Sequence, residues 1–355
     1  MYSPILRNRQ SELLAIKHLS KPIRRHLMPI VDVAAPTASA DVAEAVGYVE
    51  RSISRTQKHV TGFPAVFVDS SELEPDFRLS GNLHPLESIA AAIGRAGGRS
   101  IPVTGIHRDD AHNTVAMAIA ENQGSICVRL DATDVSTATL TVKRLGDLLA
   151  ALSFEPGRTH LLLDMQCLFG QEHDAVAKQV VRLLRMLEAQ IWAGIIVGGY
   201  GIPDQISTAV ASKEQDYLRR IEQDVFRVAA ARPMATPRWF ADYTTLSPTV
   251  VELDYRLIHK LMCPKAIYTL DDLWFVVRGG AFSSHPDGYG QYFSISDEIV
   301  ALDEYCGPDF SYGDAYIADR ANRNGKPGSP ASWITACVNH HITFTANAHA
   351  NDAEF

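Results

Sequence analysis

Short, nearly unbroken apolar runs recur along the first 280 residues, and their spacing constrains the fold more than any other feature of the sequence. Each run has a polar residue or glycine at one of its last two positions, which is typical of a strand buried on both faces of a parallel sheet. The expected strands are MPIVDV (28–33), AVFVDS (65–70), SIPVTG (100–105), ICVRLD (126–131), HLLLDM (160–165), AGIIVGG (193–199), FADYTT (240–245) and LWFVVRGG (273–280).

The segments between these runs have apolar residues at helical spacing, with charged residues on the opposite side. Strands that alternate with helices predict a parallel α/β fold, because each crossover between parallel strands needs a connection of helix length. The expected helices are 40–53, 84–96, 134–152, 174–192 and 214–231.

Two architectures fit this alternation: an open doubly wound sheet and a closed (β/α)8 TIM-barrel-like domain. Eight strand–helix units in roughly 250 residues favour the barrel. An open nucleotide-binding sheet more often has a glycine fingerprint after its first strand, and MPIVDVAAP has none. We therefore predict an α/β fold with a TIM-barrel-like domain over residues 1–280.

The remaining segment, 281–355, has a different composition. It is rich in Gly, Pro, Ser and Asn, as in GGAFSSHPDGYGQY and NRNGKPGSPAS, which predicts many loops. A strand-like run, NHHITFTA, spans 339–346. We expect a loop-rich C-terminal extension that packs on the barrel, either completing its last helices or capping one face.

Composition excludes some classes of protein. The chain has 33 Lys plus Arg against 41 Asp plus Glu, a net charge of −8, so broad nucleic-acid binding is not expected, although a local basic patch is compatible with this total. Its five cysteines contain no CxxC pair, which argues against a disulfide framework or a thiolate zinc site. The N-terminal segment is too polar for a signal peptide, and no apolar run is long enough to span a membrane. These features predict a cytoplasmic protein.

Charged residues recur near the carboxyl ends of the expected strands, where TIM barrels place their active sites. Aspartates on a common rim can bind a divalent cation such as Mg²⁺ or Mn²⁺, and arginines can hold an anionic group. The expected metal ligands are Asp69, Asp164 and Asp242, and the expected cations are Arg129 and Arg278. Two further strand-end aspartates are Asp32 and Asp131.

A structural interpretation competes with this one. Aspartate is common where a strand turns into a helix, because it caps the helix and tolerates turn geometry. Arg129 lies in an apolar run and needs a carboxylate or phosphate partner. Asp164 or Asp69 would serve as that partner in a purely structural ion pair.

Two other motifs suggest binding or acid–base chemistry. IIVGGYGIPDQI (195–206) predicts a glycine-rich turn before a helix that starts at Pro203. Backbone N–H groups there can hold the phosphate of a cofactor or substrate, although glycines also simply permit a tight turn. The glycines of this turn are Gly198, Gly199 and Gly201. His340 and His341 would face opposite sides of a strand, so that one could act as a general acid or base.

The order and spacing of the motifs resemble the phage-associated "beta protein" family over nearly the whole chain. The motifs are MYSPILRNRQSELLAI, PIVDV, VFVDS, IPV, VRLD and LLLD, then WFADYT, IYTLDDLWFVVRGG, SYGDAYI and SWITACVNHHITF. The resemblance implies a setting of phage–host conflict, without a particular reaction. The positions that match the family's recurrent motifs are Tyr2, Pro4, Glu12, Asp69, Arg129, Asp164, Asp242, Tyr243, Trp274, Arg278, Gly279, Gly313, Asp314, His340 and His341. Ala241 departs from the expected glycine, which weakens any role that needs close backbone approach there.

Two functions follow. The first is an anti-phage defence component whose barrel recognises a phage or host protein, or a neighbouring defence-system protein. The second is a metal-assisted phosphodiesterase or nuclease-type hydrolase, with Arg129 and Arg278 neutralising phosphate charge and His340 or His341 transferring a proton. The long helices 174–192 and 214–231 also allow a homodimer, although outer barrel helices need an apolar face in any case.

Overall fold

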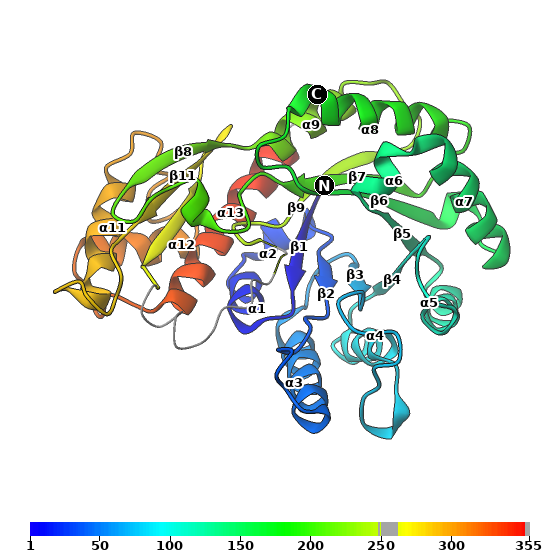
Figure 1. The fold of residues 1–355 in the computed structure, drawn as a ribbon, viewed down its shortest axis with the longest axis horizontal. Helices are drawn as coiled ribbons and strands as arrows, with labels where there is room; N and C mark the ends of the chain where they lie inside the picture. The colour runs from blue at the N-terminus through cyan, green and yellow to red at the C-terminus, as the bar shows by residue number, and fades with distance from the viewer. Residues whose placement is uncertain (248, 250–261, 352–355) are drawn as a thin grey trace.

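Eight parallel strands close into a barrel in the computed structural model, which describes residues 1–247, 249 and 262–351 (Figure 1). The TIM-barrel-like fold predicted from the strand repeat is therefore confirmed. The barrel strands in spatial order are β1 (Tyr2–Arg7), β2 (Ile30–Asp32), β3 (Val66–Asp69), β4 (Ser100–Gly105), β5 (Ile126–Leu130), β6 (Thr159–Cys167), β7 (Gly194–Tyr200) and β9 (Arg238–Asp242).

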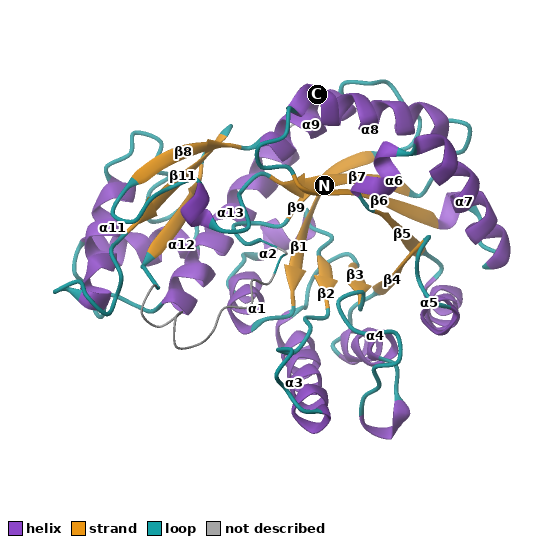
Figure 2. Cartoon of the chain, in the orientation of Figure 1, coloured by secondary structure: helices purple, strands orange, loops and turns teal. Residues whose placement is uncertain are grey.

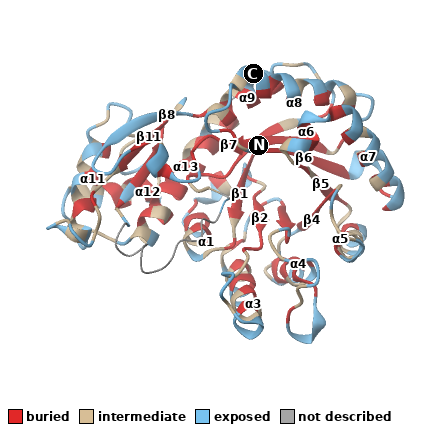
Figure 3. Ribbon diagram, in the orientation of Figure 1, coloured by how far each residue is buried: buried red, intermediate tan, exposed pale blue. Residues whose placement is uncertain are grey.

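Helices cover the outside of this barrel (Figure 2). Several begin at a side-chain cap, as α3 does with a reciprocal capping box between Asp41 and Glu44. The outer helices are α1 (Gln10–Lys17), α2 (Lys21–Arg25), α3 (Val42–His59), α4 (Pro85–Arg95), α5 (Asp110–Gln123), α6 (Ala132–Ser136), α7 (Ala138–Ala151), α8 (His173–Leu187) and α9 (Ile221–Ala230). Short 3-10 turns lie at 80–82, 156–158, 206–208 and 288–290. The barrel strands are buried along most of their length, whereas these outer helices have one exposed side (Figure 3).

The barrel closes through a strand that the sequence analysis did not predict. β1 pairs in parallel with β2 and with β9, with Ile5 opposite Ile30 and Tyr2 opposite Phe240. The predicted eighth strand, 273–280, is instead β11 (Leu273–Arg278) of a separate antiparallel sheet. Its partner β10 (Lys265–Thr269) is only three residues away in the chain, and this link is too short for a parallel crossover.

The second sheet contains three strands in the order β10, β11 and β8. β8 (Gln215–Arg219) lies inside the predicted helix 214–231, of which only the later part is helical. The prediction is wrong there because this exposed, polar edge strand is held by pairing with β11 rather than by a pattern of its own. One face of the sheet packs on α11 (Gln291–Val300), α12 (Tyr312–Ala321) and α13 (Pro330–Asn351).

Helix α13 contradicts the strand predicted at 339–346. Residues 336–343 are buried on all sides, since the helix lies between the second sheet and the α1–β1 part of the barrel. A helix buried all round has no polar face, and its sequence therefore lacks the amphipathic period by which helices are recognised. The division at residue 280 stays a prediction, and the last four residues of the predicted extension lie outside the described residues.

All five cysteines are free. Among the described residues, no helix is both long enough and apolar enough to cross a membrane.

Candidate active site

Four charged side chains point into the barrel at the carboxyl ends of its strands. Alternate residues of a strand face the same side, and the residue two positions earlier belongs in each case to the barrel interior. The pairs are Ile30 and Asp32, Phe67 and Asp69, Cys127 and Arg129, and Leu162 and Asp164. The structure thus brings three predicted site residues, Asp69, Arg129 and Asp164, together with Asp32.

Arg129 lies at the centre of this group. Its Nε donates to Asp164 at 2.9 Å, and its NH1 donates to Asp32 and to Asp69, each at 3.0 Å. Its NH2 lies 2.8 Å from the Asp164 carboxylate and donates to the Tyr243 hydroxyl at 2.7 Å. All three nitrogens of the Arg129 guanidinium thus have carboxylate or hydroxyl partners. Arg129 therefore positions the carboxylates, and its contact with a substrate phosphate stays a prediction.

The three carboxylates around Arg129 would carry more negative charge, if all were ionised, than its single positive charge neutralises. Burial raises the pKa of Asp32 to about 7, and nearby Asp69 and Glu72 add to that effect, although Arg129 opposes it. Burial also acts on Asp69, but Arg108 and Arg129 together hold the pKa of this carboxyl below its ordinary value. The three carboxyls can therefore keep one proton between them at neutral pH, and Asp32 is the carboxyl that carries it. We call Asp32, Asp69, Arg129, Asp164 and Tyr243 the mouth cluster.

A cavity of about 630 Å³ opens above the mouth cluster. At its rim, Arg108 NH2 donates to both oxygens of Asp69, at 2.9 and 3.1 Å. On the other side, Arg7 Nε donates to Glu72 at 2.5 Å. The cavity therefore has protonatable carboxyls at its base and two arginines at its edge.

Three residues of this site are not named in the sequence analysis, Arg7, Glu72 and Arg108, and Tyr243 is named there only as a position that matches a family motif. Tyr243 was recoverable, because strand alternation from Ala241 of the barrel interior places it inward. Its buried hydroxyl donates to Asp164 at 2.6 Å, and burial keeps its pKa well above the ordinary value. The other three residues lack a comparable signal, since Arg7 ends the unpredicted first strand and Glu72 and Arg108 lie in loops.

The strand-end aspartates also have the turn-forming role that the competing structural interpretation predicts. The carboxylates of Asp69, Asp164 and Asp242 each accept the backbone N–H two residues later, at 2.9, 3.0 and 3.0 Å. Turn formation thus coexists with the contacts to Arg129. Asp131 caps α6 through a capping box with Asp134, and it also lines the cavity above the mouth cluster.

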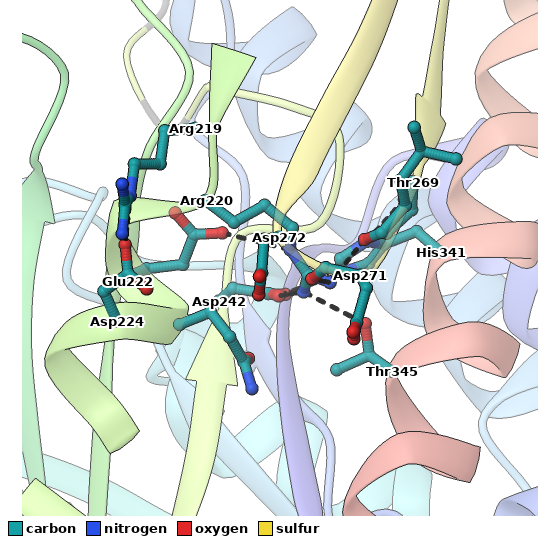
Figure 4. A network of polar contacts seen from close by, with 12 residues as sticks. Arg219, Arg220, Glu222, Asp224, Asp242, Thr269, Asp271, Asp272, His341 and Thr345 are labelled. Carbon is teal, nitrogen blue, oxygen red and sulfur yellow. Dashed lines mark hydrogen bonds and ion pairs between the residues drawn. The ribbon is translucent and has the colours of Figure 1, made fainter. Parts of the chain in front are cut away.

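Asp242 lies on the opposite side of the barrel wall from the mouth cluster. Tyr2 OH donates to its Oδ1 at 2.6 Å, and its Oδ2 lies 2.9 Å from His341 Nε2 and 3.7 Å from Arg220 NH2. His341 Nδ1 is 2.9 Å from Thr269 Oγ1. Figure 4 shows Asp242, His341 and Arg220 in one polar network. We call Tyr2, Arg220, Asp242, Thr269 and His341 the joint cluster, because they connect β1 and β9 of the barrel to α13 and the second sheet.

His340 is also buried away from the cavity. Its Nδ1 lies 2.9 Å from Asp314, and its Nε2 lies 3.0 Å from the Thr269 carbonyl. Its ring stacks on Tyr268 with centroids 3.9 Å apart, and Tyr268 OH donates to Asp314 at 2.7 Å. Both histidines lie in α13, which is a helix rather than the predicted strand. His341 belongs to the joint cluster, His340 contacts Asp314 and Tyr268, and neither reaches the cavity above the mouth cluster.

Arg278 and the glycine-rich turn are not part of the mouth cluster either. Arg278 belongs to β11, and its NH1 donates to the Val210 carbonyl. The helix predicted from Pro203 does not form, and only a short turn at 206–208 is present. A Cβ at any of the three glycines would lie less than 3 Å from Ala241, Leu168 or Glu222, so close packing accounts for them: Gly198, Gly199 and Gly201.

The predicted metal ligands are not assembled into one site. Asp242 faces outward, whereas Asp69 and Asp164 both bind Arg129, whose positive charge opposes a divalent cation at that place. Across the described part of the chain, no group of three or more His, Cys, Asp or Glu side chains is placed to hold a metal ion. The residues of the mouth therefore do not fit the predicted Mg²⁺ or Mn²⁺ site.

A family model described as Beta protein matches residues 2–347. The match covers the barrel, the second sheet and nearly all of α13. It therefore includes the mouth cluster and the joint cluster together. No curated protein matches the chain.

Proposed function

The chain belongs to the Beta protein family, and on that premise we propose that the mouth of its barrel is an acid–base active site with Asp32 as the proton-transferring group. The observation that carries this proposal is the sharing of one guanidinium by three carboxylates beneath an open cavity. Perturbed carboxyls in a cavity at the carboxyl end of a barrel are typical of catalytic sites.

Asp32 is suited to general acid–base catalysis because its pKa of about 7 leaves both protonation states populated at neutral pH. Arg129 fixes the position of Asp32 through two hydrogen bonds from NH1, at 3.0 and 3.2 Å. Tyr243 holds Asp164 and Arg129 from the other side. The remaining residues thus form a rigid base on which Asp32 exchanges a proton with a bound polar substrate.

The reaction class that we propose is hydrolysis of an ester or phosphoester bond, in which Asp32 activates water or protonates the leaving group. No step is assigned to a metal, because Arg129 occupies the carboxylates that would hold one. Arg7 and Arg108 lie at the rim, where they can orient a polar substrate.

The experiment compares the wild type with Asp32→Asn on a panel of three chromogenic esters: p-nitrophenyl acetate, p-nitrophenyl phosphate and bis-p-nitrophenyl phosphate. We expect turnover of at least one ester with an inflection near pH 7, and a loss of about 100-fold in kcat for the variant. Asp147→Asn on the exposed face of α7 is the matched control. Equal rates and pH profiles for wild type and Asp32→Asn, or no turnover of any compound, would reject the site.

We also propose a second candidate function, which rests on the resemblance to phage-associated proteins: action in phage–host conflict, with a phage or host protein or a neighbouring defence-system protein as partner. These partners, the homodimer and the cytoplasmic location stay predictions. Phage plating on cells that express wild type or Asp32→Asn tests the link to the site. If the wild type protects and the folded variant does not, defence depends on the mouth. Equal protection by the wild type and Asp32→Asn would show that defence does not depend on acid–base chemistry at Asp32.

A further inference from the structure

A second cavity, of about 250 Å³, lies between the barrel mouth and the second sheet. Its walls come from the segment that joins β1 to α1, from the loop after β7 and from Lys265 at the start of β10. Arg7, Asp32 and Tyr243 line both this cavity and the larger one. A molecule in the larger cavity can therefore extend past Asp32 into the smaller one.

Three cations line the smaller cavity: Arg7, Arg9 and Lys265. Arg7 is paired with Glu72, which does not line this cavity. Within the residues that the structure describes, the side chains of Arg9 and Lys265 form no ion pair. Cationic side chains without a carboxylate partner in a cavity are available for an anionic ligand.

Three acids also line this cavity, and they only partly offset the cations. Glu12 is buried and accepts the backbone N–H of Arg7 at 2.8 Å, and burial raises its pKa to about 8, so that it is largely uncharged at neutral pH. Asp32 already binds Arg129. Asp204 accepts a hydrogen bond from Ser247 at 2.6 Å. The cations therefore outnumber the ionised carboxylates.

The amino-terminal end of α1 adds to the positive potential. Arg9 is the N-cap residue of this helix and has no side-chain capping bond, so the first-turn N–H groups are not satisfied by a cap. Arg9, Ser11 and Glu12 all line the cavity. The partial positive charge of a helix N-terminus acts in the same direction as the Arg9 and Lys265 side chains.

We propose that this smaller cavity binds an anionic group, phosphate or carboxylate, on the substrate whose reacting bond lies at Asp32. The substrate is then a small molecule with an anionic end beside Arg9 and Lys265 and a polar part in the larger cavity. Apolar side chains, Ile202, Ile206 and Ile267, also line the cavity and can accommodate the carbon skeleton next to the anionic group. The link to Asp32 rests on the proposed function, whereas anion binding by the cavity does not.

The test is titration calorimetry of the full chain with inorganic phosphate and, separately, with acetate. We expect saturable binding of at least one anion, and tighter binding of phosphate or of acetate identifies which anionic group the cavity prefers. Lys265→Gln and Arg9→Gln should each weaken that binding about tenfold, the effect of losing one charge-assisted hydrogen bond. Lys143→Gln, at an exposed position of α7, is the control and should bind as the wild type does.

Two results would overturn the proposal: no binding of either anion to the wild type, or affinities in both cavity variants equal to that of the Lys143→Gln control. Asp32→Asn separates this proposal from the proposed function. Because the variant removes a carboxyl beside the cavity, it should bind the anion at least as tightly as the wild type. Anion binding that survives in a chain without Asp32-dependent turnover would reject the catalytic site alone.

Discussion

The mouth cluster and the joint cluster are built from the same kind of residue at nearly the same height on the barrel, yet they have different environments. Asp164 and Asp242 both lie at strand ends and both bind a backbone N–H two residues later. Asp164 lies two positions after Leu162 and points inward, beneath a cavity. Asp242 lies two positions after Phe240 and points outward, into packed protein. The side of the barrel wall to which a strand-end aspartate points thus decides whether it borders a cavity or connects two parts of the molecule.

The largest expected effect comes from breaking the joint cluster. Asp242→Ala leaves Tyr2 and His341 without their shared hydrogen-bond partner and Arg220 without one ion-pair partner, and all of these groups are buried. Removing one partner of a buried charged network costs about 3–5 kcal/mol of the free energy of unfolding. Urea denaturation measures this loss, with Asp147→Ala in an exposed pair as a control that should change stability by less than about 0.5 kcal/mol.

A smaller loss is expected at the mouth. Arg129→Met removes the partner of three carboxylates, but these groups border a cavity that water can enter, and they can also take up protons. We expect a loss of about 2–3 kcal/mol in the same urea assay, because hydration lowers the cost of the unpaired charges. If Arg129→Met lowers the free energy of unfolding as much as Asp242→Ala or more, water does not reach the mouth cluster more easily than the joint cluster.

The two clusters should also respond oppositely to pH. The pKa of Asp32 is raised by burial, so its folded form binds more protons than its unfolded form, and its contribution to stability falls as the pH rises from about 4 to about 7. The pKa of Asp242, despite its burial, is lowered by His341 and Arg220, so stability is lost as the pH falls through that pKa.

Asp32→Asn should therefore gain stability relative to the wild type between pH 5 and 7, by at most about 1.4 kcal/mol per pH unit. Urea midpoints at several pH values measure this slope. Parallel curves for variant and wild type would contradict the raised pKa of Asp32.

The smallest effect is expected for Asp131, a strand-end aspartate in neither cluster. Asp131→Ala removes the cap of α6 and should cost about 1 kcal/mol, the usual value for an N-cap. Carbon-13 NMR titration of the Asp32 carboxyl in this variant should still show an inflection near pH 7. A shifted inflection would place Asp131 in the mouth cluster.

Much of the barrel could be predicted from the sequence, because its strands are buried on both faces and appear as apolar runs. Arg129 and its carboxylates could be located for the same reason, since a strand end is easy to identify. The side to which Asp242 points follows from the alternation of Trp239, Phe240 and Ala241, whereas a strand-end position alone does not reveal it. The first strand and the two histidines could not be placed, since pairing with β9 and burial between two sheets leave no periodic signal in YSPILR or NHHITF.

Tyr2 and His341 meet at the Asp242 carboxylate, although 240 residues separate Tyr2 from Asp242 and 99 separate Asp242 from His341. During synthesis on the ribosome, β1 emerges long before its neighbour β9, and Asp242 emerges long before its histidine. The barrel therefore has open strand edges until late in translation, and unpaired edges favour aggregation. Ribosome stalling before α13 leaves a polypeptide that chaperones must protect or proteases remove.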